Sequence, residues 1–154
     1  MPGPRVKRRD RLTRCFTNGC WQATTRSRYW LSLAKSGASD MQAKDERKFL
    51  QDVLKVAYTP QDSIQPDGNI QGLGLTASYY HYLNEDHYAA THPDVIQPLE
   101  NAILAMQYGN GLGAAVGYQG SDYRSFTMGF PFECISNEKT RNAIMRGILN
   151  YIIK

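Results

Sequence analysis

A chain of 154 residues with 42% hydrophobic residues is long enough for one domain with a hydrophobic core. It contains no run of about 20 apolar residues that could span a membrane, and its first residues lack the apolar stretch of a secretory signal. The net charge of +4 arises from residues 1–40, which carry nine Lys or Arg against two Asp or Glu, whereas residues 41–154 carry nine against twelve. A mildly acidic body argues against a nucleic-acid-binding domain, which would place basic and aromatic residues on one folded face.

The first 28 residues differ from the rest of the chain. They are rich in Arg, Thr and Ser, and they show no sustained hydrophobic period of 2 or 3.6 residues. We therefore expect a disordered basic segment over residues 1–28 and a single α/β domain over residues 29–154. The sequence YWLSLA at residues 29–34 predicts a short first strand, and KSGASD after it predicts a turn.

The stretch KDERKFLQDVLKVAY predicts a helix over residues 42–56. Asp40 is a suitable N-cap, and the helix should end before Pro60. Residues 59–75 contain several Gly and Pro and are typical of a loop, with a turn at PDGN. The apolar residues of the helix fall on one side, at Phe49, Leu50, Val53, Leu54 and Ala57.

Short segments rich in strand formers follow, and turn sequences separate them. This spacing favours antiparallel strands. The segment DVIQPLENAIL is compatible with a strand or with partly helical structure. The predicted strands lie in TASYYHYL, HYAAT, AILAMQY, AAVGYQ and RSFTMGF, and the turns lie in NED, HPD, GNG and GSD.

The last helix is predicted over residues 137–153. Ile144, Ile148 and Ile152 recur at every fourth position, and Ser136 or Asn137 is its expected N-cap. Together these elements predict an α/β or α+β fold with a mixed sheet, in which antiparallel strands are packed by the helices near 42–56 and 137–153.

Side chains that could bind a metal or cofactor show no recognisable spacing. His81, His87 and His92 do not match a metal-ligand pattern, and Cys15 and Cys20 have no second Cys/His pair. The glycines of GNGLGAAVGYQG precede a strand instead of a helix, which argues against a phosphate-binding loop. We expect no metal, no cofactor and no activated nucleophile.

Tyrosines are unusually numerous, at ten in the chain. Alternation on a strand would place Tyr80 and Tyr82 on one face, and Tyr118 and Tyr123 flank the GSD turn. These rings could stack on sugars or on a neighbouring domain, although core and edge packing is the simpler interpretation.

The sequence GFPFE follows the last predicted strand. It contains Phe130, Phe132 and Glu133, at the carboxyl end of the strand, where ligands of open α/β sheets bind. Pro131 stiffens this turn and the aromatics can cover the sheet end, so Glu133 is the group that packing does not explain. Glu133 and His81 are the weak candidates for catalysis.

Several stretches resemble a known family: SGASDMQ, ERKFLQDVLK, YYHYLNEDHY and above all GFPFECISNEKTRNAIMRGILNYI. They are similar to the C-terminal domain of large bacterial secreted proteins catalogued as xanthan lyases. In that family an amidase-like module and a golvesin-type β module precede a flavodoxin-like or glutamine-amidotransferase-like α/β domain.

The resemblance covers residues 30–154 and implies a periplasmic or extracellular setting. Family members have a long chain before SGA, whereas this chain has an Arg-rich segment, as a truncated or frame-shifted product would. An amidotransferase-like site would need a Cys at the SGA turn, where this chain has Ser36, Gly37 and Ala38.

The function expected from these observations is a non-catalytic accessory domain of a glycan-active cell-envelope protein, for docking or carbohydrate binding. Its partners would be a glycan or neighbouring domains, with no nucleic acid and no membrane span. The expected ligand-binding residues are Tyr80, Tyr82, Tyr118, Tyr123, Phe130, Phe132 and Glu133. The alternative is a small glycan lyase or hydrolase that uses Glu133 with a Tyr or His.

Overall fold

The protein was analysed as a computed structural model, which describes residues 29–32, 44–59 and 67–153. The expected basic segment 1–28, the Asp40 cap and the KSGASD turn lie outside the described residues. The elements are β1 (Tyr29–Ser32), α1 (Lys44–Asp52), β2 (Val56–Tyr58), β3 (Asn69–Gly72), β4 (Leu75–Ser78), β5 (Ile96–Pro98), β6 (Ile103–Tyr108), β7 (Gly113–Gln119), β8 (Arg124–Met128), the 3-10 turn η1 (Phe132–Cys134) and α2 (Glu138–Ile153).

Most strands form one mixed sheet of six strands in the order β1-β8-β7-β6-β3-β4. The β1–β8 pair is parallel and the other pairs are antiparallel. A separate antiparallel pair, β2 with β5, forms a small second sheet. The predicted class, a mixed sheet with mainly antiparallel strands and a C-terminal helix, is therefore confirmed.

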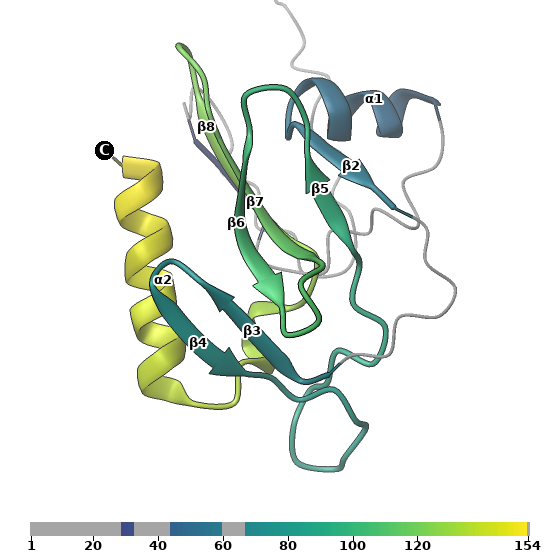
Figure 1. The fold of residues 1–154 in the computed structure, drawn as a ribbon, viewed down its shortest axis with the longest axis vertical. Coiled ribbons are helices and arrows are strands. Elements are labelled where there is room, and N and C mark those ends of the chain that lie inside the picture. The colour runs from purple at the N-terminus through teal and green to yellow at the C-terminus, as the bar shows by residue number, and fades with distance from the viewer. Residues whose placement is uncertain (1–28, 33–43, 60–66, 154) are drawn as a thin grey trace, which may run out of the picture.

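The helices lie on opposite sides of the large sheet (Figure 1). Alternate residues of a strand point to opposite faces, so Ala115 of β7 joins the core beneath α2, whereas Val116 joins Leu50 and Leu54 beneath α1. Gly113 of β7 permits β5 to approach the large sheet closely, because a Cβ at this position would collide with the carbonyl of Ile96 in β5.

The layer formed by α1, β2 and β5 covers only part of its face of the sheet (Figure 1). Val56 and Ile96 of this layer pack against Val116 of β7. On β3 and β4, by contrast, the residues facing this side are exposed, whereas Ile70 and Ala77 between them are buried in the α2 core. The exposed residues of this open face are Asn69, Gln71, Thr76 and Ser78.

Helix α2 matches its predicted range, but α1 ends at Asp52 and not at residue 56, because Val56 and Ala57 belong to strand β2, which pairs with β5. At the start of α2, the side-chain oxygen of Asn137 accepts a hydrogen bond from the backbone N–H of Thr140 at 3.0 Å, so Asn137 is the N-cap. Ser136 instead donates its hydroxyl to the carbonyl of Ser78 at 2.9 Å. The predicted stripe is also confirmed, because Ile144, Ile148 and Ile152 are the buried residues of α2.

The loop predicted over residues 59–75 was wrong in part, because residues 69–72 form β3 and pair with β4, which begins at Leu75. The strand predictions are confirmed for residues 29–32 and for the hairpins β6–β7 and β7–β8, but two were wrong. HYAAT is irregular, and the strand predicted in TASYYHYL ends at Ser78. Tyr79 forms only an isolated bridge with Ile135, and the Tyr80 N–H donates to the carbonyl of Cys134 in η1. The residues after Ser78 therefore do not continue the strand. In the ambiguous segment DVIQPLENAIL, residues 96–98 form β5 and residues 103–104 begin β6, without a helix.

Candidate ligand-binding site

The expected site residues lie in two groups near opposite ends of β8. Tyr118 and Tyr123 flank the β7–β8 turn, before β8 begins, whereas Phe130, Phe132 and Glu133 follow its last residue. A strand of five residues spans about 17 Å. These residues therefore do not form one site.

The tyrosines at the β7–β8 turn contact the layer formed by α1, β2 and β5. The Tyr118 and Tyr123 ring centroids are 5.2 Å apart, and the Tyr123 hydroxyl donates to the carbonyl of Val53 at 2.7 Å. Partial burial raises the pKa of Tyr123. Lys55, which forms a 2.8 Å ion pair with Glu100, lies 5.9 Å from the centre of the Tyr118 ring. Tyr118 and Tyr123 thus connect the β7–β8 hairpin to the segment of α1 and β2.

In the GFPFE segment only Glu133 is exposed to solvent. Phe130 is completely buried and stacks on Tyr79, with ring centroids 5.6 Å apart, so it is not available to a ligand. Phe132 is half-buried and packs against the core beneath α2. The segment is mainly a plug for the sheet end, and Glu133 of η1 is its exposed polar group.

A loop of residues 80–90, which we call the aromatic loop, adjoins η1. The Tyr80 N–H donates to the carbonyl of Cys134 at 2.8 Å, and the Ala90 N–H donates to the carbonyl of Tyr80 at 2.8 Å. The first bond attaches the loop to η1, and the second closes its base. The structure therefore brings Tyr80 and the following residues to the same end of the sheet as Glu133, although they are about 50 positions apart in sequence.

The tip of the aromatic loop is ordered by its own polar groups. The side-chain oxygen of Asn84 accepts hydrogen bonds from the backbone N–H groups of Asp86 at 3.0 Å and His87 at 2.6 Å. The His87 ring stacks on Tyr80, with centroids 4.3 Å apart and planes 11° apart. Local turns of this kind are typical of Asn, and they give the loop a defined shape.

The aromatic loop presents apolar surface to solvent. Tyr82 is 74% exposed, Tyr88 is 65% exposed and Leu83 is 83% exposed. The loop projects beyond the end of β4 at the bottom of Figure 1. The cluster of tyrosines in YYHYLNEDHY indicated the surface to which Tyr82 and Tyr88 belong, but no sequence signal indicated that Leu83 would also be exposed.

The candidate catalytic groups at this end are constrained by packing. His81 is half-buried, its Nδ1 lies 3.3 Å from the carbonyl of Tyr79, and it packs against Gly68, where a Cβ would collide with the ring. Burial, with a smaller contribution from the nearby Glu133 charge, raises the pKa of the Cys134 thiol to about 12, so the thiol is protonated at neutral pH. Within the described ranges no three His, Cys, Asp or Glu side chains are grouped to hold a metal ion.

Asp94, which is part of the predicted HPD turn, also lies near the end of β8. It is 4% exposed, and its backbone N–H donates to the carbonyl of Gly129 at 2.7 Å. Its own carbonyl accepts a hydrogen bond from the Tyr108 hydroxyl at 2.8 Å. Its backbone bonds connect the segment before β5 to the end of β8.

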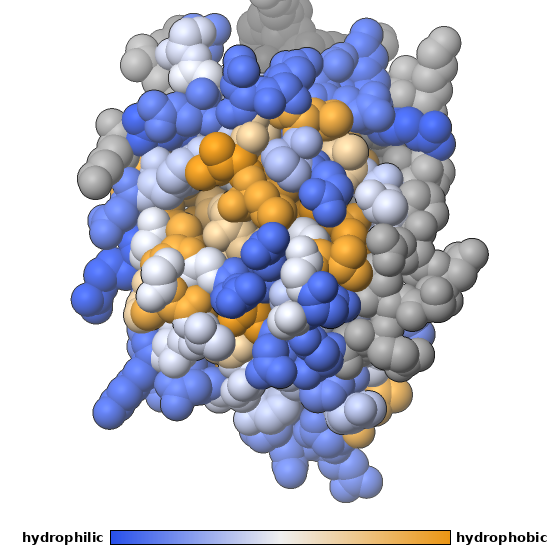
Figure 2. Space-filling model, in the orientation of Figure 1, coloured by the Kyte–Doolittle hydropathy of each residue, from blue (hydrophilic) through white to orange (hydrophobic). Residues whose placement is uncertain are grey.

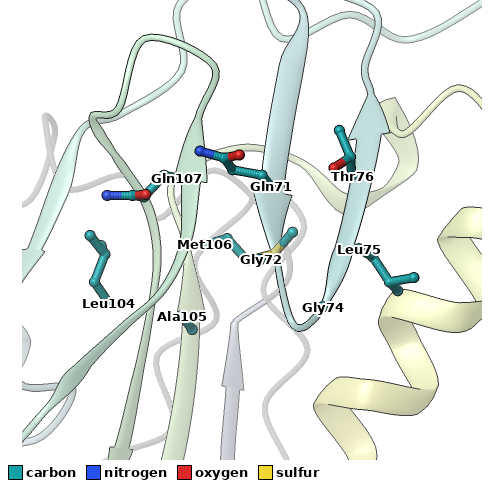
Figure 3. A pocket seen from close by; sticks show the side chains of 9 residues that line it. All are labelled: Gln71, Gly72, Gly74, Leu75, Thr76, Leu104, Ala105, Met106 and Gln107. Carbon is teal, nitrogen blue, oxygen red and sulfur yellow. The ribbon is translucent and has the colours of Figure 1, made fainter.

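A second feature, which the sequence does not indicate, is a hollow of about 470 Å³ on the open face. Apolar and polar side chains are mixed across this side of the molecule (Figure 2). The side chains of Gln107, Gln71 and Thr76 come from three adjacent strands (Figure 3). The hollow is lined by Gln71, Gly72, Gly74, Leu75, Thr76, Leu104, Ala105, Met106 and Gln107.

No helix in the described part of the chain is both long enough and apolar enough to cross a bilayer. Comparison of the chain with family models, curated proteins and solved structures finds no match.

Proposed function

We propose that this chain is a non-catalytic binding domain of a glycan-active protein of the cell envelope, and that its aromatic loop binds carbohydrate. The observation that carries the proposal is the pair of solvent-exposed rings, Tyr82 and Tyr88, on a loop closed by backbone hydrogen bonds. The setting in the cell envelope comes from the sequence resemblance.

The chemistry of the loop suits a sugar. A pyranose ring has an apolar face of C–H groups and a polar rim, and a tyrosine offers a flat apolar ring with a hydroxyl at its edge. Tyrosine also loses little side-chain entropy when it binds, because only two side-chain torsions must be ordered. The bonds made by Asn84 order the tip before any ligand arrives, which reduces the cost of binding.

Binding is favoured over catalysis by the state of the candidate catalytic groups. Glycoside hydrolysis commonly needs a pair of carboxyl groups on either side of the scissile bond, and lyase chemistry needs a positioned base. Glu133 lies exposed on a short turn, and His81 is packed against Gly68. The alternative, a lyase or hydrolase that uses Glu133 with His81 or a tyrosine, is supported by their location at one end of the sheet.

Titration calorimetry with neutral and acidic oligosaccharides tests the proposal. We expect Tyr82→Ala and Tyr88→Ala each to weaken binding by about 2- to 10-fold, because each removes one stacking ring. Tyr82→Phe keeps the ring and should bind nearly as well as the unaltered chain. Ile153→Ala, which removes an exposed apolar side chain of α2, is the matched control and should have no effect.

The same oligosaccharides serve to test the enzymatic alternative. Unsaturated-sugar absorbance and reducing ends are followed over time with the unaltered chain and with Glu133→Gln. Turnover by the unaltered chain that disappears in Glu133→Gln would replace the binding proposal with the enzymatic one. Equal binding by the unaltered chain and by Tyr82→Ala/Tyr88→Ala would exclude the aromatic loop as the site.

A further inference from the structure

We infer that the hollow on the open face is a second binding site, for a neutral polyhydroxylated ligand such as one unit of an uncharged oligosaccharide. This inference rests on the proposed function, since it assigns another subsite to the same class of ligand. It depends on different residues from those of the aromatic loop, so the two sites can be tested separately.

The polar side chains of the hollow form a row across three strands. In the sheet register, Gln107 of β6 is opposite Gln71 of β3, and Gln71 is opposite Thr76 of β4. Directly opposed residues share one face of a sheet, and adjacent strands are about 4.8 Å apart, so the row extends about 10 Å. Each amide offers both a donor and an acceptor, which are the groups that a sugar hydroxyl can pair with.

An irregularity in β6 adds an apolar wall to this row. Residues three apart on a regular strand point to opposite faces, but Leu104 and Gln107 both line the hollow. Between Leu104 and Met106 the register with β7 shifts, because two steps along β6 match one step along β7, and this extra residue in β6 reverses the alternation. Figure 3 shows Leu104 beside Gln107, while Leu75 on β4 turns toward α2.

The polar groups of the row remain available to a ligand. Within the described ranges, the side chains of Gln71 and Thr76 make no hydrogen bond to the protein, and both are exposed. Gln107 donates its amide N–H to the carbonyl of Gly111 at 3.3 Å, which leaves its amide oxygen as an acceptor. A ligand would replace water on these groups without breaking protein contacts.

Charge and size restrict the ligand class. Among the residues that the structure describes, the lining contains no Asp, Glu, Lys, Arg or His, so these residues offer a phosphate or an acidic sugar no counter-charge. The volume of about 470 Å³ lies within the usual range for small-ligand sites, about 300 to 1,000 Å³. Leu104 and Ala105 offer apolar surface for the C–H face of a sugar, while the amides face its hydroxyls.

The test measures binding of neutral xylo-, manno- and cello-oligosaccharides, and of acidic oligosaccharides for comparison, to the full chain by titration calorimetry. Gln71→Ala should raise the Kd by about 2- to 10-fold, because it removes hydrogen bonds to the ligand. Thr76→Trp fills the hollow from an exposed edge position and should weaken binding by more than Gln71→Ala. Gln119→Ala, which removes an exposed glutamine of β7 outside the hollow, is the matched control and should leave the Kd unchanged. Circular dichroism checks that each variant remains folded.

The outcomes separate the two sites. Unchanged affinity in both Gln71→Ala and Thr76→Trp overturns the hollow as a site, and the aromatic loop can still account for binding. Loss of affinity in these variants but not in Tyr82→Ala/Tyr88→Ala supports the hollow and excludes the loop. If none of the oligosaccharides binds the unaltered chain, the inference is wrong. Preferential binding of acidic over neutral oligosaccharides at the hollow would overturn the assignment of a neutral ligand.

Discussion

Truncation of Ile148 tests how α2 is packed on the sheet. Ile148 is completely buried in the core beneath α2, between Ile144 and Ile152 on the same side of the helix. Ile148→Ala removes three carbons, and at about 0.8 kcal/mol for each buried methylene the lost transfer free energy is about 2.4 kcal/mol. A cavity that relaxes only in part adds about 1 to 2 kcal/mol, so the free energy of unfolding should fall by about 3 to 4 kcal/mol.

Arg146→Ala is the matched control. Arg146 lies on the same helix and is exposed, so its truncation should change the free energy of unfolding by no more than about 0.5 kcal/mol. Both substitutions introduce alanine, which has the highest helix propensity, so a difference between them reports packing and not helix formation.

Urea denaturation followed by circular dichroism measures both effects. With an m value of about 2 kcal/mol per molar urea, Ile148→Ala should lower the midpoint by about 1.5 to 2 M while the slope stays constant. Equal midpoints for the two variants would show that the proposed orientation of α2 is wrong. A changed slope for Ile148→Ala would instead mean that the variant no longer unfolds in one step.

Three further predictions concern single contacts. Tyr123→Phe removes the 2.7 Å hydrogen bond to the carbonyl of Val53 and should lower the free energy of unfolding by about 1 kcal/mol in urea melts, whereas no change would mean that water replaces the hydroxyl. Asn137→Ala removes the cap on the Thr140 N–H and should cost about 1 kcal/mol; Asn137→Ser should restore most of it, and equal losses in both would exclude capping. Cys134 should resist thiol reagents at pH 8, because burial raises its pKa to about 12. In the unfolded chain the thiol loses its proton at a lower pH than in the folded chain. The stability that the buried, protonated Cys134 thiol contributes is therefore complete below about pH 9 and falls as the pH rises toward 12. Rapid labelling of Cys134 in the folded chain, with Cys15 and Cys20 replaced by serine, would contradict this prediction.

The sequence by itself determined the elements whose signals are local. The period of Ile144, Ile148 and Ile152, with Asn137 in front of it, is sufficient to place a helix and its buried side, because both depend on residues within a few turns of one another. The same holds for the hairpins around β7, where a short turn joins strands that pair with each other. The exposed position of Glu133 after the last strand was also predictable from its place in the chain.

Only the tertiary structure decided which distant segments meet. The strand expected through Tyr80 ends early because the Tyr80 N–H bonds to the carbonyl of Cys134, and no local pattern specifies a partner so far along the chain. Phe130 was expected to face a ligand, but stacking on Tyr79 places it in the core. The row of Gln107, Gln71 and Thr76 exists because β6 pairs with β3 in one register; a slip of one residue would turn Gln71 to the opposite face. Hydrophobic periodicity predicts which side of its own helix or strand each residue occupies. Which residues come together in a site depends instead on the pairing of strands that are distant in sequence, and this pairing is decided only when the sheet forms.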